Sequence, residues 1–235
     1  MRPGIPFLAA TLLLANAAPA AVPAGPKVVE LFTSQGCDSC PPADALLGEL
    51  AGRPGVLALA LHITYWNDLG WEDRFSQDQF DERQRVYVRQ LQLHGPYTPQ
   101  MVIDGAQDVV GSQRQDVERA LARAARPVAV ALRVDGDAIR VDLPALDAGC
   151  DCVLALFAVQ ANASTPVGRG ENAGKTLREF QLVRALRALG KWPGDARTLQ
   201  VKRARLPGHI DSVAVLAQER ATGRVVAAGQ LSLPD

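Results

Sequence analysis

Residues 35–42 read QGCDSCPP, and this short stretch decides how the first half of the chain is interpreted. Cys37 and Cys40 are three positions apart, and two prolines follow directly. The next run, ADALLGELA, places its leucines on one helical face. Proline suits the first turn of a helix, where a missing amide donor costs little. We therefore predict that the cysteine pair opens a helix over 41–51.

The segments around this helix predict an α/β unit. Residues 27–33 (KVVELFT) and 56–63 (VLALALHI) have the apolar character of buried strands. Ser76 with Gln79 forms a capping box at the start of a second helix. The sequence Asp104-Gly105 predicts a hairpin between strands. The remaining predicted elements are strands at 100–103 and 107–110 and a helix at 114–125. The order is β-α-β-α-β-β-α, with the first two strands parallel and adjacent.

The second half of the chain, from Pro127 onward, has a different texture. Alternating apolar runs predict strands at 128–134, 138–143, 152–160, 212–217 and 224–231. The leucines of 182–189 have helical spacing, but a surrounding sheet would override that propensity, so this segment stays open. The fold class predicted is α/β (α+β). One α/β domain over 27–126 precedes a mostly β, sandwich-like domain over 127–235.

Charge and the first residues narrow the functional classes. The chain has 25 Lys and Arg against 25 Asp and Glu, so no net charge attracts nucleic acid or anionic lipid. Residues 1–20 combine Arg2, an apolar run and a small-residue cleavage site, which is typical of a signal peptide. An uncleaved anchor is the alternative. With cleavage, no membrane span is expected, and the mature chain is periplasmic or secreted.

The predicted topology brings three motifs to one edge of the sheet. Loops that leave the carboxyl ends of parallel strands emerge on the same edge. The first strand leads into TSQGCDSC and the second into HITYWNDLGW, while Tyr97-Thr98-Pro99 precedes an antiparallel third strand. A cis bond before Pro99 would leave a backbone group free to pair with an extended substrate. We therefore expect Pro99 to meet the cysteine pair.

These residues resemble the thioredoxin superfamily over about 27–126, through C-x-x-C at the start of a helix and Thr-Pro before a later strand. The resemblance implies that Cys37 is the exposed nucleophile, that Cys40 resolves the mixed disulfide, and that Pro99 is cis. It also implies that Glu30 is near the position of a buried carboxylate that assists Cys40. The motifs VELFTSQGCDSCPPAD, HITYWNDLGWEDRF, YTPQMVIDG and GRGENAGKTL are similar to a bacterial family of secreted, thioredoxin-like proteins described only as a domain of unknown function.

The aromatic loop that begins at His62 has two interpretations. Together with Tyr97 and Thr98, His62 and Trp66 would line a substrate groove beside Cys37, or the aromatic residues simply cover the core. The acidic residues of this loop, Asp68, Glu72 and Asp73, are interpreted as a solvated rim.

A second cysteine pair, Cys150 and Cys152, enters a strand of the second half. Residues two apart face the same side of a strand, so their sulfur atoms can approach. An isolated structural pair and a relay with Cys37 and Cys40 are the alternatives.

The favoured function is thiol–disulfide exchange with exported protein thiols or disulfides and a redox partner, without an organic cofactor. A three-residue spacing gives a structural clip little stabilisation, which favours chemistry at Cys37 and Cys40. One alternative is a copper-binding or delivery protein in which Cys37, Cys40 and His62 are ligands, aided by Met101. Another is an inert interaction module that has kept the redox fold.

Overall fold

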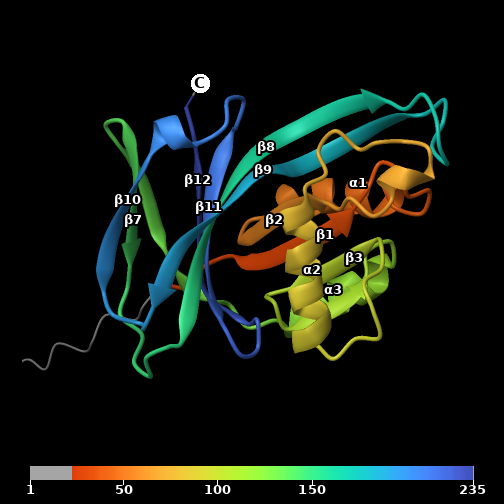
Figure 1. Ribbon diagram of the computed structural model, residues 1–235. Coiled ribbons are helices and arrows are strands. Elements are labelled where there is room, and N and C mark those ends of the chain that lie inside the picture. The colour runs from red at the N-terminus through yellow and green to blue at the C-terminus, as the bar shows by residue number, and fades with distance from the viewer. Residues whose placement is uncertain (1–22, 235) are drawn as a thin grey trace, which may run out of the picture.

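The computed structural model describes residues 23–234, and the expected signal peptide at 1–20 lies outside them. The described chain forms three α-helices and two β-sheets (Figure 1). The helices are α1 (Pro41–Ala51), α2 (Asp78–Gln90) and α3 (Arg114–Arg123), with 3-10 turns η1 (Asn67–Leu69) and η2 (Arg203–Arg205). The strands are β1 (Lys27–Thr33), β2 (Val56–His62), β3 (Gln100–Ile103), β4 (Gln107–Val110), β5 (Val128–Ala129), β6 (Ala131–Asp135), β7 (Ala138–Leu143), β8 (Cys152–Pro166), β9 (Thr176–Trp192), β10 (Arg197–Lys202), β11 (Ser212–Glu219) and β12 (Val225–Ser232). Within 23–234, no helix is long and apolar enough to cross a membrane.

The larger sheet has nine strands in the order β4-β3-β1-β2-β9-β8-β11-β12-β5. Strands β1 and β2 are parallel and end together, where Thr33 pairs with His62. Strand β3 is antiparallel to β1. These pairings confirm the predicted order of elements over the first half. Because β1 and β2 end together, the loops that follow them leave from one edge of the sheet.

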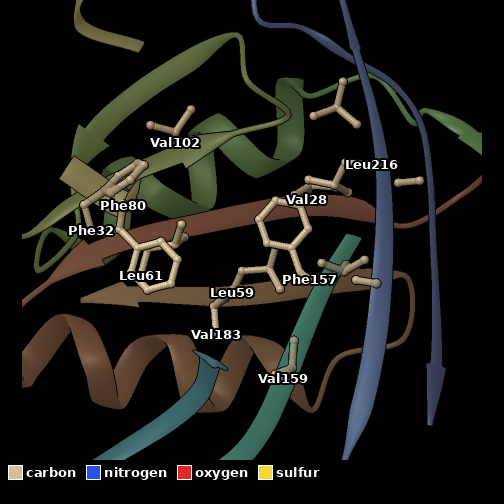
Figure 2. Packing of buried hydrophobic residues seen from close by; sticks show 14 of the residues in the cluster. Val28, Phe32, Leu59, Leu61, Phe80, Val102, Phe157, Val159, Val183 and Leu216 are labelled. Atoms are coloured by element: carbon tan, nitrogen blue, oxygen red, sulfur yellow. The ribbon is translucent and has the colours of Figure 1, made fainter. Parts of the chain in front are cut away.

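Different helices cover the two faces of β1. Val29 packs with α1 and α3 in one core. Its neighbour Val28 points the other way and packs with Phe32 and with Phe80 of α2 in a second core. Strands β8, β9 and β11 curl over this second face, so Phe157 of β8 lies in the same core (Figure 2). The side-chain face of a β1 residue therefore decides which helix it meets.

The leucine-containing segment that the sequence left open is the long strand β9. It pairs with β8 from Trp192 opposite Cys152 to Thr176 opposite Pro166. It also meets β2, where Leu182 is opposite Ala60. Hydrogen bonding to neighbouring strands overrides the helical spacing of the leucines. The resulting β8–β9 ribbon extends past the edge where β1 and β2 end (Figure 1).

The smaller sheet has the order β10-β7-β6 and faces β8, β11 and β12. Side chains from both sheets, including Ile139, Leu154 and Trp192, enclose a third core between them. Strand β10 was not predicted. Because β9 pairs with β2, strands from both halves of the chain share the larger sheet. The division into domains at residue 127 stays a prediction.

Two local predictions are wrong. Helix α2 follows Gln77 as its N-cap, and Ser76 instead donates its hydroxyl to the carbonyl oxygen of Asp73 (2.8 Å). The expected strand over 128–134 is divided into β5, which pairs with β12, and β6, which pairs with β7. The chain changes sheets at Val130. Gly229 permits this crossing, since a Cβ there would be 2.0 Å from the Val130 carbonyl oxygen.

Candidate functional site

Cys37 and Cys40 form a disulfide in the loop between β1 and α1. Their Cα atoms are 5.4 Å apart, and Cys40 is the N-cap residue of α1. Prolines occupy the first two helical positions, as the sequence predicts. The amide group of Asp44 donates to the Cys40 carbonyl oxygen (3.1 Å), which closes the first turn. The Cys40 sulfur therefore lies at the positive end of the helix dipole.

The disulfide is buried, which contradicts the expectation of an exposed Cys37. Both cysteines have 0% exposed surface, whereas the intervening Asp38 and Ser39 are exposed. Asn172, at the tip of the β8–β9 ribbon, donates to the carbonyl oxygen of Cys37 (2.9 Å). The second half of the chain therefore covers the loop that holds the pair.

The Thr98-Pro99 segment lies at the same edge of the sheet. The Thr98–Pro99 bond is cis, as the resemblance implied. Trp66 Nε1 donates to Thr98 Oγ1 (2.9 Å). Trp66 also lies against the cysteine loop, because a Cβ on Gly36 would be 3.1 Å from the Trp66 Cβ. Trp66 thus connects the two motifs. Tyr97 points elsewhere and donates its hydroxyl to Asp108 (2.7 Å).

Glu30 does not lie where the resemblance placed it. It shares the α2 face of β1 with Val28 and Phe32, whereas α1 covers the opposite face. Arg83 of α2 donates to both carboxylate oxygens, and the Tyr87 hydroxyl donates to Oε1 (2.5 Å). This is a buried, fully partnered ion pair, so Glu30 is not available to assist Cys40.

A different acid lies on the Cys40 side of α1. Asp44 is four residues after Cys40, so the two side chains share a helical face, and both residues are buried. Burial raises the pKa of Asp44 to about 7, although the positive charge of His62 opposes the shift. A carboxyl group one helical turn from the disulfide can therefore take up or release a proton near neutral pH.

His62 is part of the same buried cluster. It ends β2, and its Nδ1 is 2.7 Å from Asp73 Oδ2. Burial lowers the pKa of His62, but the charge and hydrogen bond of Asp73, together with the charges of Asp44 and Glu179, outweigh burial, so the net shift is upward. The pKa of Asp73 is lowered, since the His62 charge and hydrogen bonds outweigh desolvation. The His62 Nε2 atom has no hydrogen-bond partner among the described residues. The interpretation of Asp73 as a solvated rim is wrong, because only 2% of its surface is exposed.

Gln35 links this cluster to the second half of the chain. Its backbone amide donates to Asp73 (2.8 Å), and its side-chain amide donates to Thr165 Oγ1 (3.1 Å) and to Glu179. Trp71 Nε1 donates to Gln35 Oε1 (2.9 Å). Desolvation raises the pKa of Glu179. No local pattern places Thr165 and Glu179, since their positions depend on the length of β8 and on β9 being a strand.

Comparisons with known proteins show which proteins this chain is similar to. The profile of the family described as "Protein of unknown function (DUF1223)" matches residues 28–218. The chain belongs to the DUF1223 family. A crystal structure of protein AGR_C_4864 from Agrobacterium tumefaciens is similar, with 29% identity, 91% of this chain and 96% of that chain covered, and a TM-score of 0.70. HBP35 of Porphyromonas gingivalis shares the fold, with 16% identity, 89% and 76% coverage, and a TM-score of 0.59. A search of curated proteins found no match.

The second cysteine pair of this DUF1223 chain is distant from the first. Cys150 and Cys152 form a disulfide, with Cys152 buried in the core between the two sheets. Cys152 begins β8, whereas the far end of β8, at Pro166, leads into the tip that covers Cys37. Over these residues an extended strand spans roughly 45 Å. A relay within one molecule between the two pairs is therefore not supported.

The metal alternative gains no support from the donor set of this DUF1223 chain. Across residues 23–234, no group of three or more His, Cys, Asp or Glu side chains is arranged to hold a metal ion. Cys37 and Cys40 are bonded to each other, and Asp73 engages Nδ1 of His62. Met101 is buried in the core beneath α1 and α3.

Proposed function

We propose that this chain is an exported thiol–disulfide oxidoreductase of the thioredoxin superfamily, which acts on other exported proteins through Cys37 and Cys40. The observation that carries the proposal is the disulfide at the first turn of α1, with a buried Asp44, whose pKa is raised to about 7 by burial, one turn further along. A permanent clip needs no such acid. The three-residue spacing also gives such a clip little stabilisation.

The exchange begins when a thiolate of the partner protein attacks the sulfur of Cys37. The Cys37–Cys40 bond breaks, a mixed disulfide forms on Cys37, and the electron pair leaves on Cys40 as a thiolate. The N-terminus of α1 stabilises that thiolate. A second partner thiolate then attacks its own sulfur in the mixed disulfide and releases Cys37. The partner becomes a disulfide and this chain a dithiol; in the reverse direction, Cys37 attacks and Cys40 resolves.

We assign proton exchange at Cys40 to Asp44 in place of Glu30. Burial disfavours the charged thiolate form of Cys40, so a nearby proton donor stabilises the reduced site by converting this thiolate to a thiol. The Asp44 carboxyl group lies on the same helical face as Cys40 and can be that donor. The proton passes from the carboxyl group to Cys40 on reduction and returns on oxidation. The His62 charge, held by Asp73, favours the ionised form of Asp44 that results. Asp44 acts only through Cys40, so its replacement should change the pH profile of exchange.

The motifs at the edge of the sheet suggest how a partner segment is held. Thr98 and Pro99 lie beside the cysteine loop, to which Trp66 connects them. We propose that an extended partner segment lies along Pro99, with Trp66 and Thr98 beside it. The proposed periplasmic or secreted location rests on the signal peptide expected at residues 1–20, and the proposed polypeptide partner rests on the cis Thr98–Pro99 bond beside the cysteine loop.

A trapping experiment tests the proposal. Cys40→Ala removes the resolving thiol. The Cys37 thiolate of this variant can still attack a disulfide of an exported protein and release one partner thiolate, so mixed disulfides on Cys37 should accumulate in an extract whose exported proteins keep their disulfides. Cys37→Ala is the matched control and should trap much less, because in the proposed exchange Cys40 resolves the mixed disulfide and does not attack the partner. Equal and negligible trapping by both variants, with Cys37 and Cys40 unreactive to a dithiol, would overturn the proposal and favour an inert interaction module.

A further inference from the structure

We propose that the tip of the β8–β9 ribbon, residues 167–175, is a lid that controls access to Cys37, with Asn172 as its latch. This inference rests on the proposed exchange at Cys37. An attacking thiolate must approach the sulfur of Cys37 along the disulfide axis, yet the residue has 0% exposed surface. The reaction therefore requires some segment to move.

The tip is joined to the cysteine loop by few hydrogen bonds. Asn172 is fully buried, and its Nδ2 donates to the carbonyl oxygens of Gln35 (3.0 Å) and Cys37 (2.9 Å). Among the described residues, these are the two hydrogen bonds that join 167–175 to the rest of the chain. Lys175 Nζ donates to Asn172 Oδ1 (2.9 Å), which orients the amide so that its nitrogen faces the cysteine loop. One side chain thus holds the cover in place.

The remainder of the tip is built to move as a unit. Its other backbone hydrogen bonds are internal, such as those from Val167 to Lys175 and from Gly174 to Val167. Gly170 and Gly174 have positive φ angles of 75° and 78°, which glycine adopts without strain. Val167 and Asn172 are the buried residues of the tip, and the other seven residues of 167–175 are exposed. Lifting of the tip therefore uncovers few side chains.

Trp71 determines where the lid rests. A Cβ on Gly170 would be 3.1 Å from the Trp71 Cβ, so a larger residue there would push the tip away from this ring. Trp71 Nε1 also donates to Gln35, next to the loop that Asn172 holds. The closed position is thus defined on one side by Trp71 and on the other by the Cys37 carbonyl oxygen. A partner that displaces Asn172 from these carbonyl groups would open the site.

Lid opening can be tested without any protein partner, by reduction of the purified oxidised chain with dithiothreitol. Asn172→Asp keeps the size of the side chain but places an acceptor against two carbonyl oxygens, and Asn172→Ala removes the latch. Loss of two hydrogen bonds should accelerate reduction of Cys37–Cys40 by about 10- to 100-fold. Glu171→Gln, which changes the charge of an exposed residue on the same tip, should leave the rate unchanged. Alkylation followed by peptide mass spectrometry distinguishes the two disulfides.

The Cys150–Cys152 disulfide is an internal reference in every variant. Its reduction rate should not change, because it lies at the other end of β8. Wild-type rates for Cys37–Cys40 in both Asn172 variants would overturn the lid. Equally faster reduction of both disulfides would also overturn the lid, because that result would show that the substitution loosens the whole fold. The trapping experiment is separate: a lid that opens with no trapped partner would refute the proposed exchange and leave the lid standing.

Discussion

The two faces of the β1–β2 pair bury acidic residues in opposite ways. On the α2 face, Glu30 is paired with Arg83, and the Tyr87 and Gln218 side chains complete the network. On the α1 face, Asp44 and Glu179 lie near the disulfide with His62 as the neighbouring cation, and no Lys or Arg pairs with either acid within the described chain. The first arrangement pairs the acid with a cation. The second leaves two acids whose pKa is raised by burial, that of Asp44 to about 7.

This contrast assigns different roles to residues of the same chemical type. A carboxylate that is held by a guanidinium stays ionised and contributes to a fixed structure. A buried carboxyl group without such a partner exchanges its proton when its surroundings change. Only the second kind is useful beside a disulfide, since each reduction and oxidation there moves protons. The α1 face is therefore the chemical face of the sheet.

The largest expected effect on stability follows from Arg83→Met. The substitution leaves the Glu30 carboxylate buried without its cation, which should lower the free energy of unfolding by about 3–5 kcal/mol. Urea denaturation measures the loss. Arg85→Met, on the exposed side of the same helix, is the matched control and should cost less than about 1 kcal/mol. The double variant Arg83→Met/Glu30→Gln should recover much of the loss, and a double variant no more stable than Arg83→Met would refute the ion-pair account.

The next largest effect is a change in the pH dependence of stability in Asp44→Asn. The Asp44 pKa is about 7 in the folded chain against an ordinary value of 3.8, so the folded state holds a proton that the unfolded state releases. The free energy of unfolding of the wild type should therefore fall as pH rises from about 4 to about 7, by up to about 4 kcal/mol. Asn cannot ionise, so the variant should lose this fall and be the more stable protein at pH 8.

The His62 pKa, which is also raised, adds a separate decrease that begins above its unfolded value of about 6.5. Both variant and wild type should keep that decrease. Asp38→Asn, at an exposed position between the two cysteines, should leave the wild-type curve unchanged. When a dithiol reduces the Cys37–Cys40 disulfide, the plot of the reduction rate against pH should show an inflection near pH 7 in the wild type and none in Asp44→Asn. Parallel stability curves for Asp44→Asn and wild type would show that Asp44 has no raised pKa.

The sequence contained enough information to place the cysteine pair and the edge of the sheet. Hydrophobic runs and the turn at Asp104 predicted the order of elements over 27–126, with the first two strands parallel, and this arrangement brought Pro99 to the edge where Cys37 lies. Asp44 could also have been found. It is three residues before Leu47 on the apolar stripe of α1, and an acid at such a position is a signal for a buried titratable group.

The remaining features depend on contacts that no local pattern specifies. Every residue near Glu30 in KVVELFT is apolar, so the run does not show which side chains face α1. Asn172 contacts Cys37 across a sequence separation of 135 residues, as the hydrogen bond between them records. Glu179 could be placed only once β9 was known to be a strand, and the leucine spacing concealed that. Long-range pairing, rather than propensity, decided all three.

The smallest of the expected effects concerns the buried His62–Asp73 pair on the α1 face, and Asp73→Asn tests it. The negative charge of Asp73 raises the His62 pKa, so its removal should lower that pKa, as an NMR titration of the ring protons would show. Asp73 also accepts the backbone amides of Gln35 and Phe75, and Asn keeps one acceptor oxygen. The free energy of unfolding should therefore fall by only about 1.5–3 kcal/mol. Glu72→Gln, the exposed neighbour, should change neither quantity. If the His62 pKa stayed constant in Asp73→Asn while stability fell, the His62–Asp73 pair would be purely structural, and the charge of Asp73 would not contribute to the titration of the α1 face.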